Sequence, residues 1–258
     1  MRKKVFIKNR KGLKMSVLIE ESSNQKGLAI IQHGLGGFKE QAHIQTFADA
    51  FRESGYTVVR LDTTNSCNES EGKLEDSTPT KSYEDLVDFL EWSKEQSWYQ
   101  EPFVLVAHSL GGLCISLYAK NYPEKVKALA PIATVVSGKL KLVSPGWQEF
   151  LKDWKRDGIR EWESSTKKGL IKRLKWEFVE DLQKYDLLQS ANKLTMPVLM
   201  IVGEDDESIP VEHQKKLFDK LPGPKEFHII KGAPHTFKDK KHLKEIKKIF
   251  VDWINKLK

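Results

Sequence analysis

A serine, a pair of aspartates and a histidine occur in three short motifs whose order suits nucleophilic catalysis. Ser109 lies in Ala-His-Ser-Leu-Gly-Gly at 107–112, and His235 lies in Gly-Ala-Pro-His-Thr-Phe at 232–237. Between them, Asp205 and Asp206 lie in Gly-Glu-Asp-Asp-Glu-Ser-Ile-Pro at 203–210. A serine hydroxyl is a weak nucleophile at neutral pH, and a histidine oriented by a carboxylate activates it by accepting its proton. These residue types predict a Ser-His-acid triad, with either aspartate as the acid.

A glycine-rich segment and the turn around Ser109 could together bind the negative charge that this reaction develops. The segment His-Gly-Leu-Gly-Gly at 33–37 can bring a backbone N–H close to a reacting carbonyl group. We expect the N–H groups of Leu35 and Leu110 to form an oxyanion hole, and His33 to hold the loop. The segment lacks the full dinucleotide fingerprint, and the chain has no P-loop, so phosphate binding is the weaker interpretation.

The elements that must position these motifs are short apolar strands separated by helical segments. Continuous apolar runs suit strands of a parallel sheet that is covered on both faces. The expected strands span residues 28–31, 57–61, 103–106, 126–132, 198–202 and 226–230. An antiparallel hairpin at 5–7 and 15–19 precedes them. Because each chemical motif follows a strand, an open, doubly wound α/β fold would bring all of them to one edge of the sheet.

One region interrupts this alternation. Residues 135–193 contain no strand-like run, and they hold four of the seven tryptophans, Trp147, Trp154, Trp162 and Trp176. We expect a mostly helical cap insertion at 135–193 that covers the ligand crevice of a core formed by 1–134 and 194–258. The alternative is a basic surface excursion whose tryptophans pack only for stability.

Composition sets the broad class. The chain has 258 residues and 39% hydrophobic residues, enough for a single large α/β unit with a buried core. The net charge of +7 makes an anionic partner conceivable, but no recognition motif accompanies it, so we expect no nucleic acid partner. No stretch is apolar for the roughly 18 residues of a membrane helix, and no secretory signal precedes the first strand. Cys67 and Cys114 suit free thiols, and a cytoplasmic location is expected.

Together, the ordered motifs resemble the α/β-hydrolase superfamily over nearly the whole chain. In that family a loop of the form Gly-x-x-Asp-x-x-hydrophobic-Pro carries the acid, and matching Gly203, Ile209 and Pro210 places it at Asp206, with Asp205 as the rival. The glycine-rich loop and the insertion are similar to capped serine esterases, which include cinnamoyl and feruloyl esterases, monoacylglycerol lipases and serine-aminopeptidase-like hydrolases. The family loop Asp-x-x-Gly-x-Gly-x-Ser-x-Gly departs at 62–72, where Asn65 and Cys67 replace glycines.

The resemblance implies a serine carboxylesterase that hydrolyses small-molecule carboxylic esters through an acyl-enzyme. Ser109, His235 and Asp206 would be catalytic, and Trp147 and Trp154 in the cap would contact the substrate. No metal or organic cofactor is implied. A peptidase, an amidase or a thioesterase with the same triad is the alternative, and a catalytically silent fold used for binding is a further one. The oligomeric state, including a homodimer, is left open.

Overall fold

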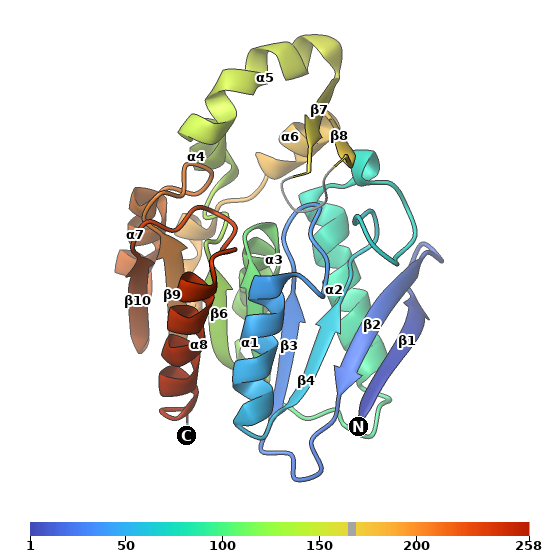
Figure 1. The fold of residues 1–258 in the computed structure, drawn as a ribbon, viewed down its shortest axis with the longest axis vertical. Helices are drawn as coiled ribbons and strands as arrows, with labels where there is room; N and C mark the ends of the chain where they lie inside the picture. Colours follow the sequence, from blue (N-terminus) through green and yellow to red (C-terminus); the bar gives the residue numbers. More distant parts are fainter. Residues whose placement is uncertain (165–168, 258) are drawn as a thin grey trace.

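The computed structural model describes residues 1–164 and 169–257 and is centred on an eight-stranded sheet, in the order β1-β2-β4-β3-β5-β6-β9-β10 (Figure 1). Its strands are β1 (Arg2–Lys8), β2 (Lys14–Glu20), β3 (Leu28–Gln32), β4 (Thr57–Leu61), β5 (Phe103–His108), β6 (Val126–Ile132), β9 (Val198–Gly203) and β10 (Lys225–Ile230). β1 and β2 form the antiparallel hairpin, and β2 is antiparallel to β4. The remaining neighbours in the order β4-β3-β5-β6-β9-β10 pair in parallel. The predicted α/β-hydrolase fold is confirmed.

Helices cover both faces of the sheet, as its buried and mostly apolar central strands require. The helices are α1 (Ala42–Glu53), α2 (Pro79–Ser93), α3 (Leu110–Asn121), α4 (Gly138–Leu142), α5 (Pro145–Asp157), α6 (Glu177–Leu182), α7 (Val211–Lys220) and α8 (Lys240–Ile254). One core joins α2, α3 and α7 to the sheet, and a second joins α1 and α8 to its other face. In α8, Ile246, Phe250 and Trp253 are buried while lysines fill the exposed positions, which is the amphipathic pattern of a surface helix.

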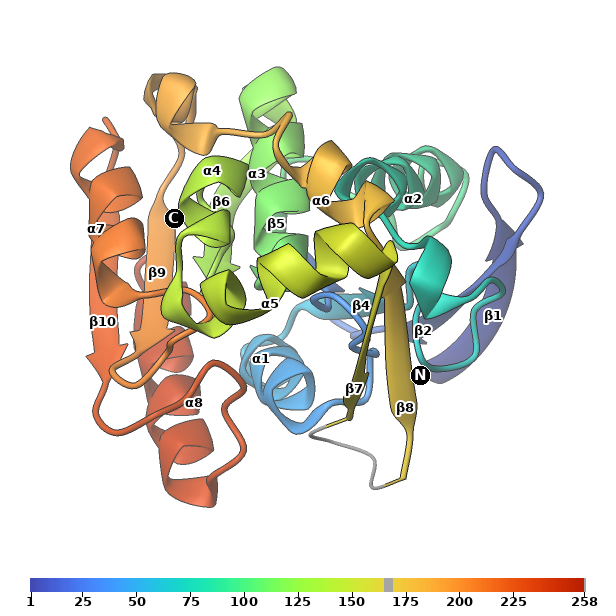
Figure 2. The same ribbon diagram turned by 90° about the horizontal axis from the view of Figure 1, so that it is seen from above.

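The segment between β6 and β9 forms a cap above one end of the sheet (Figures 1 and 2). It holds α4, α5 and α6, but also an antiparallel pair, β7 (Ile159–Glu163) and β8 (Ile171–Lys175). The three helices agree with the mostly helical cap that was predicted, whereas the hairpin was not predicted. Both strands are short and mostly charged, so no apolar run marks them, and they are held by packing against the cap helices. Residues 165–168 of the predicted cap lie outside the described residues, and its limits at 135 and 193 remain a prediction.

The connections that follow β3, β5, β9 and β10 carry the chemical motifs, and the cap begins after β6. All five strands run in parallel, so their carboxyl ends lie at the same edge of the sheet. This edge faces the cap in Figure 1. Within residues 1–164 and 169–257, every helix is too short or too polar to span a lipid bilayer.

Candidate active site

Ser109 lies at a sharp turn between β5 and α3. Its φ of 55° and ψ of −117° are unusual for a residue other than glycine and cost roughly 1–3 kcal/mol. Neighbouring backbone holds the turn, since the Ser109 N–H donates to the Ile132 carbonyl at 2.9 Å and its own carbonyl accepts from the Val135 N–H at 3.2 Å. A Cβ at Gly111 would lie 2.4 Å from the His33 carbonyl oxygen. Only glycine at 111 therefore allows the glycine-rich loop to approach the turn.

Three predicted residues from three loops form one hydrogen-bonded chain. The Ser109 hydroxyl and His235 Nε2 are 2.9 Å apart, and His235 Nδ1 lies 2.7 Å from Asp206 Oδ2. The carboxylate of Asp206 is fully buried, and its other oxygen accepts from the Ile209 N–H at 2.7 Å. With Nδ1–H donating to Asp206, Nε2 is free to accept the Ser109 proton. Asp205 is exposed, so the tertiary structure decides between the two aspartates in favour of Asp206.

Two buried histidines support the loop that carries His235. The Nε2–H of His108 donates to the His235 carbonyl at 2.9 Å, and the two rings are 4.7 Å apart. His43 packs against His108 with ring centroids 4.5 Å apart. Burial lowers the pKa of His43 to about 3 and lowers the pKa of His108 well below its usual value. Both rings are therefore neutral near pH 7 and add no charge beside the triad.

The two predicted oxyanion donors lie beside the nucleophile. Leu35 and Leu110 line the same cavity as Ser109 and His235. A Cβ at Gly34 would lie 3.0 Å from the Ser109 Cβ, so the loop is in contact with the nucleophile turn. Leu110 begins α3, where the first N–H groups have no partner within the helix. Leu35 and Leu110 thus lie beside the nucleophile, and their role as oxyanion donors remains a prediction.

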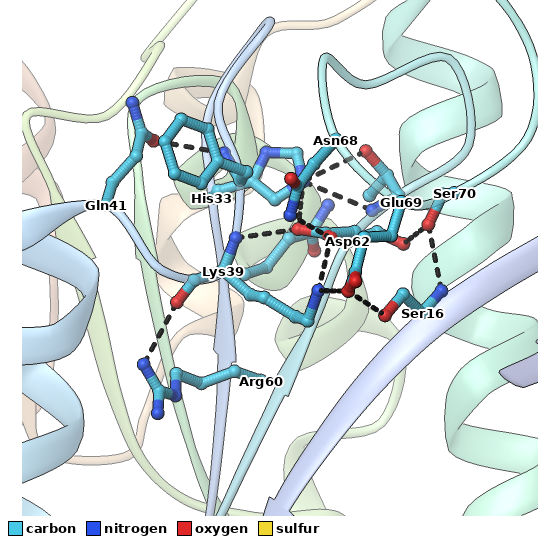
Figure 3. A network of polar contacts seen from close by, with 12 residues as sticks. Ser16, His33, Lys39, Gln41, Arg60, Asp62, Asn68, Glu69 and Ser70 are labelled. Carbon is cyan, nitrogen blue, oxygen red and sulfur yellow. Dashed lines mark hydrogen bonds and ion pairs between the residues drawn. The ribbon is translucent and has the colours of Figure 1, made fainter. Parts of the chain in front are cut away.

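A network of buried charges holds the glycine-rich loop from below (Figure 3). The Lys39 ammonium, with no exposed side-chain surface, lies 2.7 Å from Asp62 Oδ2 and 2.7 Å from Glu69 Oε2. Burial lowers the pKa of Lys39, but its hydrogen bonds to Asp62 and Glu69 together raise the pKa by more than burial lowers it. The pKa of Lys39 therefore lies above its ordinary value. The hydrogen bonds of Lys39 and Lys4 lower the pKa of Glu69 to about 2. Lys39 and Glu69 therefore both stay ionised near neutral pH.

His33 links this network to the loop. Its Nδ1–H donates to the Gly34 carbonyl at 2.7 Å, and its Nε2 accepts from the Thr63 N–H at 3.2 Å. Burial lowers the pKa of His33, which keeps the ring in the neutral form that these two bonds require. His33 therefore contacts loop backbone on both sides, which agrees with the holding role expected for it.

The loop after β4 shows how this chain replaces a family glycine. Asn65 has a φ of 57°, a left-handed conformation that asparagine adopts more readily than most residues. A Cβ at Gly72 would meet the Asn65 side-chain oxygen at 2.3 Å, so the two positions depend on each other. The Ser70 hydroxyl donates to the Asp62 carbonyl at 2.8 Å and accepts from the Ser16 N–H at 2.9 Å. The loop thus keeps a tight turn and is anchored to β2.

A cavity of about 250 Å³ lies between the triad and the cap. Ser109 and His235 contribute to its core side, and Trp147 and Trp154 contribute to its cap side. Trp154 also donates its Nε1–H to the Leu174 carbonyl at 2.9 Å, so it stabilises the cap hairpin as well. The structure brings both predicted tryptophans to the nucleophile, and their contact with substrate remains a prediction.

A second cavity of about 160 Å³ reaches Ser109 from the side of the glycine-rich loop. It shares Leu35, Trp162 and His235 with the first cavity. Lys172 of β8 lines it and donates to the Gly36 carbonyl at 2.9 Å, which ties the cap to the loop. Ser109 therefore lies where two compartments meet.

Two cationic residues in the larger cavity were not predicted as site residues, Lys141 and Arg160. Arg160 lies on β7 with Trp162 two positions later, and both line the cavity while Glu161 between them is exposed. This period of two is the signal that could have revealed both the strand and its inward face. Lys141 lies on the five-residue α4, which is too short to carry a periodic signal.

Comparison with family models gives two matches. Residues 29–166 match the model described as alpha/beta hydrolase fold. Residues 116–258 match the model described as PhoPQ-activated pathogenicity-related protein.

Comparison with individual proteins gives relatives of the same fold. The mitochondrial palmitoyl-protein thioesterase ABHD10 of Mus musculus is 28% identical over 204 residues, 79% of this chain and 67% of that protein. The Bos taurus counterpart is 26% identical, with 65% of its length covered, so the match spans about two thirds of these curated relatives. The structure of Est1E from Butyrivibrio proteoclasticus with bound ferulic acid superimposes with a TM-score of 0.82, 22% identity and 98% coverage of both chains. That of mouse alpha/beta hydrolase domain-containing protein 10 gives a TM-score of 0.80, with 22% identity over 99% and 100% of the two chains.

Proposed function

We propose that this chain, which belongs to the alpha/beta hydrolase fold family, hydrolyses carboxylic esters by serine catalysis. Through residues 116–258 it also belongs to the family described as PhoPQ-activated pathogenicity-related protein. Membership of the first family makes the chain a hydrolase. The observation that carries the finer proposal is the unbroken chain from Ser109 through His235 to Asp206, which opens into a cavity under the cap. Ester hydrolysis is the reaction that this arrangement supports best.

Acylation begins when the Ser109 oxygen attacks the ester carbonyl and His235 Nε2 takes the hydroxyl proton. The imidazolium that forms is stabilised by the buried Asp206 carboxylate, which lies 2.7 Å from His235 Nδ1. The N–H groups of Leu35 and Leu110 stabilise the tetrahedral oxyanion, each at roughly 3–4 kcal/mol. The C–O bond to the leaving group then breaks, and His235 returns the proton to the departing oxygen.

Deacylation repeats the sequence with water. His235 Nε2 takes a proton from water, and the resulting hydroxide attacks the acyl carbonyl of the Ser109 ester. Collapse of the second tetrahedral intermediate releases the carboxylic acid and returns a proton to the Ser109 oxygen. The strained turn at Ser109 keeps the oxygen facing both compartments throughout.

Thioester hydrolysis is the second candidate, because the mouse and bovine relatives are named as palmitoyl-protein thioesterases. The same triad would serve, with a thiol as leaving group. A peptidase or amidase activity would also use it, and a matched ester and amide pair separates these reactions.

The proposal is tested with 4-nitrophenyl esters from acetate to palmitate, methyl ferulate, and matched oxygen and thio esters of butyrate. Ser109→Ala should lower kcat by about 10⁶-fold, and Asp206→Asn by about 10⁴-fold. Two matched controls are Ser116→Ala, which removes another buried hydroxyl of α3, and Asp205→Asn beside the acid. Both controls should retain wild-type rates.

A fluorophosphonate probe gives an independent readout, since it should label wild type at Ser109 and leave Ser109→Ala unlabelled. Activity that survives in Ser109→Ala, or equal losses in Asp205→Asn and Asp206→Asn, would disprove the assignment of the triad. A larger kcat/KM for the thio ester than for its oxygen counterpart would favour the thioesterase.

A further inference from the structure

The larger cavity is lined by two cations and by no aspartate or glutamate of the described chain. Lys141 comes from α4 and Arg160 from β7, and the cavity walls around them are mostly apolar or aromatic. Resting on the proposed function, we propose that this cavity binds an acyl group with an apolar body and a negatively charged end, received by Arg160 and Lys141. The preferred substrates are then esters of acids that carry a second acidic group.

Arg160 is held by aromatic rings rather than by a carboxylate. Its guanidinium lies 3.7 Å from the centroid of Phe150 and 5.4 Å from that of Trp162. None of the ion pairs formed among residues 1–164 and 169–257 includes Arg160, and Glu149 is the acidic residue whose field acts on it. Burial lowers the pKa of Arg160 and the field of Glu149 opposes that shift, but an arginine stays protonated in either case. Aromatic contacts leave the N–H edge of the guanidinium available, and that edge matches a carboxylate in a bidentate geometry.

Lys141 is also buried without an opposing charge in contact. Its residue surface is 5% exposed, and Nζ donates to the Ser208 carbonyl at 2.7 Å and to the Ser208 hydroxyl at 2.5 Å. Nζ also lies 4.6 Å from the ring of Trp147. An ammonium group has three donors, so one remains for a ligand. A buried cation without a counterion costs free energy, and an anion in the cavity would offset that cost.

The charged end is placed on the acyl side because the two compartments differ. The smaller compartment lies along the glycine-rich loop and is suited to a compact leaving group. The larger one extends from Ser109 to Val135 and Phe178, whose side chains can contact methylene or aromatic groups. At about 250 Å³ it is smaller than most ligand pockets, so a short acyl group fits it better than a long fatty acyl chain.

The test compares two esters that differ only at the far end of the acyl group. Mono-4-nitrophenyl adipate carries a carboxylate where 4-nitrophenyl hexanoate carries a methyl group, and half-esters from glutarate to suberate vary the reach. We compare kcat/KM for each pair, after division by the rate of hydroxide-catalysed hydrolysis. Wild type should prefer the charged ester at one or more lengths by about tenfold to 100-fold, the range for charge-assisted hydrogen bonds.

Variants separate binding from cap stability. Arg160→Gln and Lys141→Gln should each lower the charged-to-neutral ratio, and Arg160→Glu should invert it. Arg156→Gln is the matched control, because Arg156 is an exposed arginine of α5 that pairs with Asp153 and Asp157. It should keep the wild-type ratio. Loss of cap structure would lower both rates and leave the ratio unchanged, so an unchanged ratio in Arg160→Gln, Lys141→Gln and Arg160→Glu overturns the proposal.

Two further outcomes are decisive. A preference for an anionic leaving group, seen with 4-carboxyphenyl hexanoate against its methyl ester, would overturn the placement on the acyl side. If wild type hydrolyses neither ester of any pair, the proposed function fails separately, and a binding measurement then tests the anion site.

In calorimetry, monomethyl adipate should bind Ser109→Ala, and it should bind Ser109→Ala/Arg160→Gln at least tenfold more weakly. Methyl hexanoate should bind neither protein. Equal binding of monomethyl adipate by the two proteins overturns the site.

Discussion

Two lysines on opposite sides of the active site are buried to a similar degree, but they differ in their partners and in the direction of their pKa shifts. Lys39, below the glycine-rich loop, has no exposed surface and contacts Asp62 and Glu69 at 2.7 Å. Lys141, above the cavity, is 5% exposed and contacts only uncharged groups of Ser208 and the ring of Trp147. Paired acids raise the pKa of Lys39 in spite of its burial, whereas burial lowers the pKa of Lys141 to about 7.

Two arginines repeat this contrast, Arg60 fully buried and Arg160 half-buried. Arg60 donates to Glu20 at 2.6 Å, to Gln45 at 2.6 Å and to the Lys39 carbonyl at 3.0 Å. Arg160 lies against aromatic rings. Below the site, Lys39 and Arg60 each pair with an acidic side chain, and Arg60 also donates to the Lys39 carbonyl. Above the site, Lys141 and Arg160 form no ion pair with an acidic side chain of the described residues. This is the arrangement expected of a site whose counterion is a bound anionic ligand.

The largest expected effect comes from breaking the paired set. Lys39→Met should lower the free energy of unfolding by about 3–5 kcal/mol, because Asp62 would remain buried without its cation. Urea denaturation followed by tryptophan fluorescence measures the change. Removing both charges in Lys39→Met/Asp62→Leu should recover part of the loss. A single variant as stable as wild type would show that the pair does not hold this region.

A smaller effect follows from titration of the unpaired lysine. The unfolded pKa of Lys141 is near 10.5 and the folded one is about 7, so between these pH values the unfolded chain binds more protons. The free energy of unfolding should therefore rise with pH in this window, by at most about 1.4 kcal/mol per pH unit. Below about pH 7 the cost of burying the charge is present in full.

The measurement is the stability of wild type minus that of Lys141→Met between about pH 6 and pH 9. This difference should become more favourable to wild type as the pH rises. Asp206 raises the pKa of Lys141 and Arg160 lowers it. His213 also faces Lys141, and its own pKa is lowered mainly by burial and also by Lys216 and Lys141. A difference that stays constant with pH would show that Lys141 does not titrate in this range.

The smallest effect concerns selectivity. Raising the pH from about 6 to about 8.5 should lower the ratio of kcat/KM for mono-4-nitrophenyl adipate over 4-nitrophenyl hexanoate by roughly three- to tenfold, because Lys141 loses its charge. Titration of the triad affects both esters and cancels in the ratio. Lys141→Gln should show a ratio that no longer changes with pH, and Arg160 should sustain what preference remains. A wild-type ratio that rises with pH would contradict the role of Lys141.

Much of the fold and the catalytic part of the site could be predicted because their signals are local. A buried parallel strand needs an apolar run, and a nucleophile turn needs small residues at fixed offsets from Ser109. The order of Ser109, the acid loop and His235, each after a strand, then places them at one edge. The cap hairpin escaped prediction because five-residue strands with alternating charges carry too little apolar signal.

The buried cations escaped prediction for a different reason. Lys39, Lys141 and Arg160 look like ordinary surface residues in a chain that has 43 lysines and arginines. Whether such a side chain pairs with an acid, a carbonyl group or an aromatic ring depends on residues far away in the chain. The contacts of Lys39 with Glu69 and of Lys141 with Ser208 exist only in the folded structure, because the partners are far apart in the chain.

By itself, the sequence determined the strand–helix alternation, the positions of Ser109 and His235 after their strands, and the glycine-rich loop that approaches the nucleophile. Local backbone preferences and hydrophobic periodicity are sufficient for these features. Only the tertiary structure decided that Asp206 rather than Asp205 orients His235, and that Lys141 and Arg160 line the cavity without acidic partners. Adjacent side chains share the same local sequence, so their roles separate only when packing buries one, exposes the other and sets the distance to a partner.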